Sequence, residues 1–260
     1  MRRPVCSRAG KQMNADKQIG LPINKWIKKD IMGKEKSERL QTSLLNAKEK
    51  ELLIWLGNRQ PSWVTSDMLT YFGVAAAVLY ALFCWLSNSN VYYLWAASFC
   101  LVLNWYGDSL DGTVARVRNT QRPKYGFFID HSLDALTTCL FCIGLGLAPV
   151  MKLSIAMFIL AGYLCLSIYT YLSTIVMDKF RLTYGKLGPT EVRLIIIAVF
   201  ILCMYTPWSG VGFNIGETFW TVFDCIGAVV AIILFTIYIC QLAADLRYLA
   251  KIDPPKKAGK

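Results

Sequence analysis

The chain has 260 residues, of which 55% are hydrophobic and 17% are charged, yet its formal net charge at pH 7 is +11. A soluble domain typically has about 45–50% apolar and about 25% charged residues. Here the charges are segregated, because residues 1–66 hold 14 of the 28 basic and 6 of the 17 acidic residues, which leaves +3 for the remaining 194. The composition excludes an ordinary soluble enzyme and favours a membrane protein whose basic segments face anionic lipid, not nucleic acid.

The N-terminal quarter divides into two segments. Residues 1–36 are polar and lack periodicity, which predicts a mobile segment. Residues 37–60 place four leucines at roughly helical spacing: Leu45, Leu52, Leu53 and Leu56. This spacing, with Trp55, predicts an amphipathic helix that lies on the membrane surface. A helix that binds a partner protein is the alternative.

The rest of the chain is dominated by long uncharged stretches. A helix needs about 20 apolar residues to cross a hydrocarbon core of about 30 Å. Six stretches approach or exceed that length: Met68–Ser87, Val91–Gly107, Ala135–Val150, Leu153–Met177, Leu194–Trp208 and Cys225–Ala244. They predict an all-α integral membrane protein, with a six-helix domain over residues 61–250 and a basic tail over residues 251–260.

Basic residues gather on alternate connections between these stretches. They lie in residues 116–124, 179–186 and 247–260, whereas Lys152 is the one basic residue of the other connections. The positive-inside rule therefore predicts that both termini are cytoplasmic. The short six-span form favours a bacterial inner membrane over the membrane of an organelle.

Four carboxylates flank the loop between the second and third predicted spans. Asp108 and Asp111 are three residues apart, and Asp130 and Asp134 are four apart, so each pair shares one helix face. The loop is short, so we expect the two helices to be neighbours and the two pairs to converge. Grouped carboxylates repel one another unless a cation lies between them. Oxygen ligands favour Mg²⁺, Mn²⁺ or Ca²⁺ over zinc, and four acids can hold two ions.

The residues between the acids are small or basic. Gly112 directly follows Asp111 and removes a side chain where a phosphate or a base could approach. Ala115 is a small residue on the same helix face. Gly126 likewise removes a side chain, just before the second pair of acids. Arg116 offers a planar fork for a diphosphate. The alternative is a helix end at which aspartates and loop arginines form salt bridges, but four acids with two glycines make it less favoured.

These positions together resemble a known signature. The run Asp108-x-x-Asp111-Gly112-x-x-Ala115-Arg116, followed after nine residues by Gly126-x-x-x-Asp130-x-x-x-Asp134, resembles the motif of the CDP-alcohol phosphotransferase (CDP-alcohol phosphatidyltransferase) family at eight fixed positions. The resemblance implies a six-helix membrane enzyme, commonly a homodimer, that transfers a phosphoryl group from a CDP-linked donor to an alcohol and releases CMP.

The resemblance also implies roles for individual residues. Asp108, Asp111 and Asp130 would hold two Mg²⁺ or Mn²⁺ ions, and Asp134 would be the general base or a further metal ligand. The CDP site would be lined by three small residues, with Arg116 near the diphosphate: Gly112, Ala115 and Gly126. A looser resemblance at the entry to the first span implies that Asp67 and Thr70 approach the nucleotide.

Two further residues are candidates from their positions. His131, the only histidine of the chain, directly follows Asp130 and is a candidate catalytic residue, with a structural hydrogen bond as the alternative. Arg193 opens the fifth span at the depth of the acids. It could bind the acceptor or a phosphate, or it could pair with Glu191 to cap the helix.

The substrates stay open between two branches of the family. The Asp-His-x-x-Asp spacing resembles the choline/ethanolamine phosphotransferase branch, in which a CDP-aminoalcohol reacts with diacylglycerol. The short chain resembles the phosphatidyltransferase branch, in which CDP-diacylglycerol reacts with a small polar alcohol, and we favour this branch. Alternatives of another class are a divalent-cation transporter and an inactive lipid-binding scaffold. The grouping of the acids at one membrane face argues against transport, and the intact set of four argues against an inactive site.

Overall fold

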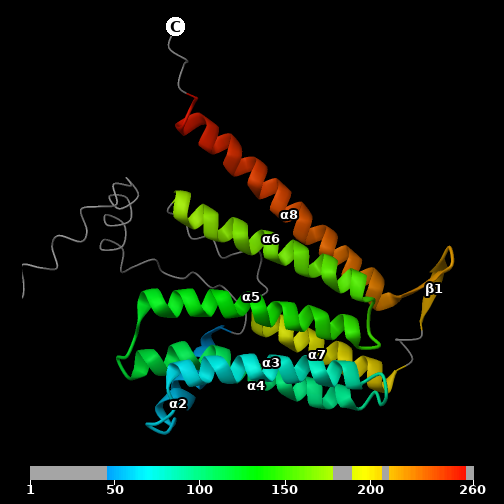
Figure 1. Cartoon of the computed structure of the whole chain (residues 1–260), viewed down its shortest axis with the longest axis horizontal. Coiled ribbons are helices and arrows are strands. Elements are labelled where there is room, and N and C mark those ends of the chain that lie inside the picture. Colours follow the sequence, from blue (N-terminus) through cyan, green and yellow to red (C-terminus); the bar gives the residue numbers. More distant parts are fainter. Residues whose placement is uncertain (1–45, 178–188, 207–210, 256–260) are drawn as a thin grey trace, which may run out of the picture. The chain divides into compact units, whose positions relative to one another are not determined.

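A computed structural model describes residues 46–177, 189–206 and 211–255 of the chain. Most of these residues form the helices of Figure 1: α2 (Asn46–Asn58), α3 (Ser66–Leu86), α4 (Tyr93–Val117), α5 (Pro123–Leu147), α6 (Leu153–Met177), α7 (Pro189–Tyr205) and α8 (Val222–Ile252). The helices from α3 to α8 overlap the six predicted spans, and the helical fold class is confirmed. The segment 1–36 and the end of the basic tail, beyond residue 255, lie outside the described residues.

The helices pack in an order that differs from their order in the chain. α3 contacts α4 and α5, α5 contacts α6, and α6 contacts α8, while α4 also contacts α2 and α7. Figure 1 shows α6 and α8 on one side of α5 and the α3–α4 pair on the other. The two acid-bearing helices, α4 and α5, were expected to be direct neighbours. Instead, each makes its main contacts with α3, which holds them together.

Within the described residues, four helices are long and apolar enough to cross a membrane: α3, α5, α6 and α8. α7 has 17 residues, and α4 has 25 but carries Asp108 and Asp111 in its second half. The polar residues that mark α4 as functional thus also make it a weaker apolar span. An integral membrane protein is supported, and the six-span arrangement stays a prediction.

A buried tyrosine joins three of the helices. Tyr80 of α3 is fully buried, and its ring lies 5.3 Å from that of Phe141 on α5 and 6.1 Å from that of Phe200 on α7. These rings belong to the largest cluster of buried apolar side chains, to which α4 contributes Leu94 and Leu101. The cluster stabilises the half of the helices away from the acids and leaves the other half for polar side chains.

Local sequence sets the helix ends nearest the acids. The Thr65 hydroxyl accepts a hydrogen bond of 3.2 Å from the backbone N–H of Met68 and caps α3. α4 ends before Asn119, whose φ of 56° lies in the left-handed region that asparagine tolerates. Pro123 then opens α5, because its missing N–H costs nothing at a first helical position. The resulting short connection places Asp130 two turns into α5.

Two glycines allow α3 and α4 to approach closely beside the acids. A Cβ added at Gly107 would lie 2.6 Å from the Leu69 carbonyl oxygen and 2.7 Å from the Gly73 nitrogen, both backbone atoms. Such distances are below van der Waals contact, so only glycine fits at this crossing. Asp108 and Asp111 follow within four residues, and the crossing therefore brings the start of α3 against both acids.

Gly107→Ala tests this close approach. Alanine would favour the helix by about 1 kcal/mol over glycine at an unconstrained position. Because its Cβ would meet backbone here, we expect a net loss of about 1–3 kcal/mol in the free energy of unfolding instead. Thermal unfolding of purified protein in detergent would measure it. Gly126→Ala is the matched control, since a Cβ there meets no described atom within 4 Å, and equal losses in both variants would contradict the packing role.

The predicted surface helix 37–60 is described from Asn46 as α2, and it packs against α4. Leu53 and Leu56 contact a cluster formed by Leu69, Leu110 and Val114, whereas Leu52 and Trp55 are exposed. The predicted leucines therefore do not share one environment, because α2 has one apolar side against α4 and a second that remains exposed. Its location on the membrane surface stays a prediction, and Leu45 lies outside the described residues.

A β-hairpin between α7 and α8 was not predicted. β1 (Gly212–Ile215) pairs antiparallel with β2 (Thr218–Thr221) through a two-residue turn in which Gly216 has a φ of 62°. Beside it, the Lys152 ammonium lies 4.5 Å from the centre of the Trp220 ring. Asp224 forms a capping box with Thr221 and accepts a 2.7 Å hydrogen bond from the Lys152 backbone N–H. Asp224 therefore has a structural role at the far end from the acid cluster.

Candidate active site

The four predicted acids come together at one end of the helices. Three of them, Asp108, Asp130 and Asp134, line one pocket with residues of α3, α4 and α5: Thr70, Gly73, Val74, Asn104, Leu133 and Thr137. The carboxylate of Asp134 interacts electrostatically with the other three acids and with Arg193. The two pairs of acids thus converge as expected, but they do so because α4 and α5 both pack against α3.

Thr70 links α3 to the fourth acid. Its hydroxyl donates a hydrogen bond of 2.6 Å to Asp111 Oδ2, and it also lies 3.1 Å from the carbonyl oxygen of Ser66, one turn earlier. The second Asp111 oxygen accepts from the backbone N–H of Gly112. Asp111 is therefore oriented by hydrogen bonds from two donors. The structure thus places Thr70 beside the acid cluster, and its approach to the nucleotide stays a prediction.

A buried arginine neutralises part of the cluster. Arg193 of α7 donates a 2.6 Å hydrogen bond from Nη2 to Asp108 Oδ2 and a 2.9 Å bond from Nε to Asn104 Oδ1. Asn104 in turn donates 2.9 Å to the carbonyl oxygen of Gly73. The side chain of Arg193 is 9% exposed and that of Asp108 is 29% exposed. The structure places Arg193 beside the acids with Asp108 as its partner, and its binding of an acceptor or a phosphate stays a prediction.

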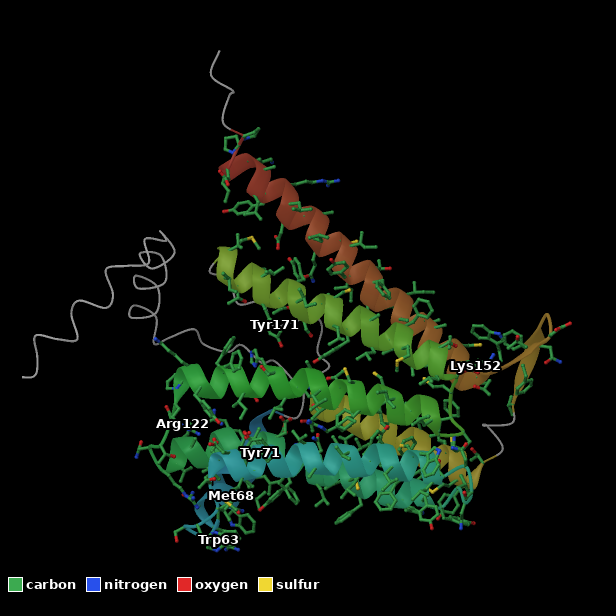
Figure 2. All side chains as sticks on the ribbon, in the orientation of Figure 1. Trp63, Met68, Tyr71, Arg122, Lys152 and Tyr171 are labelled. Atoms are coloured by element: carbon green, nitrogen blue, oxygen red, sulfur yellow. The ribbon has the colours of Figure 1, made fainter. Side chains whose placement is uncertain are left out.

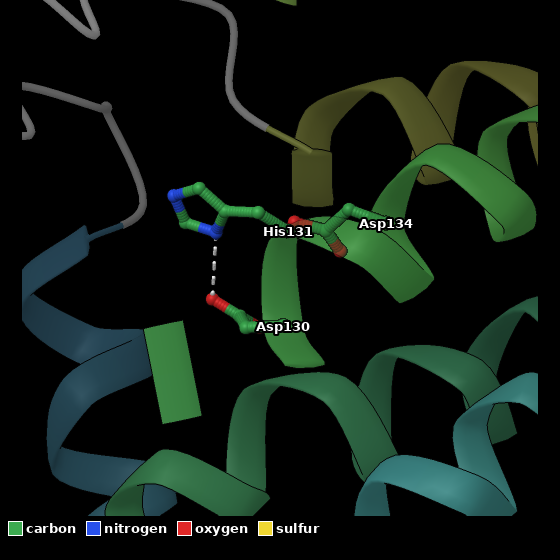
Figure 3. A group of neighbouring side chains, drawn as sticks. All are labelled: Asp130, His131 and Asp134. Carbon is green, nitrogen blue, oxygen red and sulfur yellow. Dashed lines mark ion pairs between the residues drawn. The ribbon is translucent and has the colours of Figure 1, made fainter. Parts of the chain in front are cut away.

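The single histidine belongs to the same cluster. Figure 3 shows His131 beside Asp130 and Asp134, and one ligand atom from each of the three lies within 4.8 Å of the others. His131 Nδ1 is 3.4 Å from Asp130 Oδ2 and, among the described residues, has no hydrogen-bond partner. Its ring lies between those of Phe127 and Tyr171, with centroid distances of 4.1 and 5.2 Å. The two rings hold the imidazole at the edge of the carboxylates.

Two of the small residues predicted for the CDP site border open space. A Cβ added at Gly126 would meet no atom of the described residues within 4 Å, and one at Gly112 would meet only Arg116 Nη2, at 4.0 Å. Packing therefore does not explain either glycine, in contrast to Gly107. Arg116 is exposed and donates a 3.0 Å hydrogen bond to Thr113 one turn earlier. Ala115 is half-buried on the same final turns of α4.

Asp67 lies outside the pocket lining, as do seven other predicted residues: Asp111, Gly112, Ala115, Arg116, Gly126, His131 and Arg193. The carboxylate of Asp67 pairs with Arg122, the residue before α5, and the Arg122 guanidinium lies 4.0 Å from the centre of the Tyr125 ring. Figure 2 shows Arg122 at the same end of the helices as Met68, whereas Lys152 lies at the opposite end. The ion pair joins the start of α3 to the start of α5 beside the acids.

Several polar residues of the site were not predicted. Asn104 could have been found, because it is a polar residue in an apolar run four positions before Asp108. The role of Arg118 could not have been predicted. Its guanidinium donates hydrogen bonds to backbone carbonyl oxygens of the segment before α3, including one of 2.7 Å to Pro61 and one of 3.0 Å to Gln60. Such contacts depend on the packing of α3 against α4, which no local sequence pattern shows.

The donor set fits a divalent cation. Among the described residues, Asp130, His131 and Asp134 bring one possible ligand atom each within 4.8 Å of the others. Carboxylate oxygens suit Mg²⁺ and Mn²⁺, and His131 adds a nitrogen that Mn²⁺ accepts more readily than Mg²⁺. The fixed positive charge of Arg193 balances one of the four acids, so an excess of negative charge remains for cations. Open space at Gly112 and Gly126 adjoins this set and gives room for a phosphate-bearing ligand.

Comparison with known proteins agrees with this geometry. The sequence model of the CDP-alcohol phosphatidyltransferase family matches residues 63–239, which include all four acids. The chain is similar to cholinephosphotransferase 1 of Homo sapiens, with 25% identity over 167 residues that cover 60% of this chain and 40% of that protein. The corresponding protein of Bos taurus is 26% identical over 171 residues, again 60% and 40% of the two chains.

A bacterial relative matches a shorter stretch. Phosphatidylinositol phosphate synthase of Cutibacterium acnes is 37% identical over 71 residues, which cover 27% of this chain and 32% of that protein. The matched segments thus span less than half the length of these curated relatives. The family match, by contrast, covers well over half of the chain. The chain therefore belongs to the CDP-alcohol phosphatidyltransferase family, whose members are transferases.

Proposed function

We propose that this protein is a metal-dependent membrane transferase that cleaves a CDP-linked donor, releases CMP and joins the phosphoryl group to an alcohol. The observation that carries the proposal is the convergence of four carboxylates from α4 and α5 beside one buried arginine. A transporter would place its acids near the middle of several spans, and here Asp224, at the far end, is occupied in capping α8.

The acids divide into two roles in this proposal. Asp108, Asp111 and Asp130 would hold two Mg²⁺ or Mn²⁺ ions, which when bound neutralise charge on the departing CMP. Asp134 accepts the proton of the acceptor hydroxyl, whose oxygen forms the new bond to phosphorus as the bond between phosphorus and CMP breaks. Such a base contributes about 10²–10⁴-fold to the rate. His131, beside Asp130, is a second candidate for handling that proton.

The residues around the acids would bind the donor. Gly112 and Gly126, which border open space, leave room for the nucleotide, with Ala115 small on the same side. Arg116 is exposed and would exchange its hydrogen bond to Thr113 for the diphosphate. Thr70 and Asp67 would contribute from α3, Thr70 by orienting Asp111 and Asp67 by fixing Arg122 at the pocket entrance.

For the donor we propose CDP-diacylglycerol, with a small polar alcohol as acceptor. The reason is the small size of the helical domain, which resembles the phosphatidyltransferase branch. A CDP-aminoalcohol that reacts with a diacylglycerol-like lipid is the second candidate. Two observations favour it, the position of His131 directly after Asp130 and the similarity of 60% of the chain to a protein named cholinephosphotransferase 1.

We also propose how the protein lies in its membrane. Six spans, α3 to α8, would place the acids at the cytoplasmic face with both termini on that side, in a bacterial inner membrane. α2 would lie along the membrane surface, with its exposed Leu52 and Trp55 toward the lipid headgroups. The functional unit would be a homodimer, as is common in the family.

A release assay tests the reaction and separates the two donors. Purified protein in detergent with Mg²⁺ or Mn²⁺ should release CMP from CDP-diacylglycerol in the presence of small alcohols, and EDTA should abolish the release. Release from CDP-choline or CDP-ethanolamine with diacylglycerol instead would support the second candidate. If protein that binds the metal released no CMP with any combination of donor and acceptor, the result would contradict transferase activity and favour an inactive scaffold.

A further inference from the structure

Glu49, in the first turn of α2, joins three helices through one carboxylate oxygen. Its Oε1 accepts a hydrogen bond of 2.7 Å from the indole N–H of Trp105 on α4 and one of 2.8 Å from the hydroxyl of Thr190 on α7. All three side chains are half-buried. Hydrogen bonds to an ionised acceptor are about twice as strong as neutral ones. This contact is therefore more than a surface interaction of α2.

The two partners of Glu49 lie beside the ion pair of the site. Trp105 precedes Asp108 by three residues on α4, and Thr190 precedes Arg193 by three residues on α7. Residues three apart share a helix face and are separated by about 4.5 Å along the axis. The Glu49 bridge and the Arg193–Asp108 bond therefore tie the same two helices together, within one turn of each other.

α7 contacts α4 among the described helices. Arg193 bonds to Asp108 and Asn104 of α4, and three apolar residues beyond it join the main buried cluster: Ile196, Phe200 and Cys203. α2 is in turn fixed on α4 by Leu53, Leu56 and Gly57, whose Cα region lies against Thr113 and Val117. A carboxylate on the fixed helix can thus hold the first turn of α7.

We propose that Glu49 is a positioning residue for Arg193: it holds the first turn of α7 so that the guanidinium reaches Asp108 and Asn104. Its effect on turnover rests on the function proposed above, whereas its effect on the position of α7 does not. Loss of Glu49 would let Arg193 move away from Asp108. The guanidinium would then offset less of the negative charge of the acid cluster. The cluster would then bind a divalent cation more tightly but orient the reacting groups less well.

Two measurements on the full chain in detergent test this proposal, with Glu49→Ala and Thr190→Val as variants. Hydrogen–deuterium exchange should rise at residues 189–196 in both, because each variant removes the hydrogen bond between Glu49 and Thr190. The affinity for Mn²⁺ alone, measured from the EPR signal of the free ion, should increase about threefold, within the coupling range of contacting residues. Glu51→Ala, at an exposed neighbouring position, removes the same charge and should change neither measurement.

Coupling to Arg193 distinguishes positioning from general destabilisation. In an Arg193→Gln background, or in Arg193→Lys if the first is poorly folded, Glu49→Ala should no longer change Mn²⁺ affinity. An equal change in both backgrounds, or unchanged exchange over residues 189–196, would overturn the proposal. If the protein released no CMP at all, the proposed function would fail, while the exchange measurement would still decide the role of Glu49.

Discussion

Asp134→Asn should lower the rate of CMP release by about 10²–10⁴-fold, the contribution of a positioned general base. Asparagine has the same shape but cannot accept the proton of the acceptor hydroxyl. The helix should be unaffected, because Thr137 and Thr138 bond to the backbone oxygen of residue 134 and not to its carboxylate. We therefore expect donor affinity to stay within a few-fold of the parent, measured by equilibrium binding of labelled donor.

Asp108→Asn is the comparison that gives this result its meaning. Asp108 is a proposed metal ligand and the partner of Arg193, so its loss should weaken both Mn²⁺ and donor binding. If Asp134→Asn weakened donor binding to the same degree, Asp134 would be mainly a metal ligand and the base would have to be sought elsewhere. His131 would then be the first candidate, because it lies beside Asp130 and within reach of the same cluster.

The sequence was most informative where function imposes residue type at short spacing. The two pairs of aspartates identified the site because carboxylates at intervals of three and four share a helix face whatever the tertiary structure. The apolar stretches likewise located α3 to α8, although the charged ends of α4 and α5 extended beyond them. These charged ends carry the acids. A search for apolar stretches therefore omits the part of each helix that forms the site.

Contacts between helices were the part that the sequence could not predict. The close approach at Gly107 and Gly73, the partner of Arg193 and the bridge from Glu49 all depend on which helices are neighbours. Asp67 illustrates the limit, because the looser resemblance implied an approach to the nucleotide, which stays a prediction, but gave no sign of its ion pair with Arg122. Without the packing order, an acid near the cluster cannot be distinguished from an acid that joins two helix ends.

The polar residues of α4 explain why this helix is both central and the less apolar of the long helices. Asn104, Asp108 and Asp111 would be costly in lipid, yet each has a partner from a neighbouring helix or an adjacent backbone group. α3 covers one side of α4, and α2 and α7 cover others. The stability of this arrangement therefore depends on charge balance within the cluster, which Arg193 supplies in the absence of metal.

Arg193→Ala should consequently destabilise the protein unless a divalent cation is added. Removing one partner of a buried ion pair costs about 3–5 kcal/mol, and because Asp108 keeps 29% exposure we expect a loss below that range, about 2–3 kcal/mol. Thermal unfolding in detergent with EDTA measures this loss. Arg193→Lys is the matched control, since it keeps the positive charge but lacks the fork that reaches both Asp108 and Asn104, and it should lose less.

Addition of Mg²⁺ then reveals whether the arginine and the cation act on the same carboxylates. A ligand that binds only the folded state raises its stability in proportion to the logarithm of its concentration over its dissociation constant. The cluster of Arg193→Ala has one more uncompensated negative charge than the parent, so the same Mg²⁺ concentration should raise its unfolding temperature further. Equal stabilisation of parent and variant would mean that the cation binds away from Asp108. A larger rise in the variant would support Asp108 as a residue shared between the arginine of the metal-free protein and the metal site.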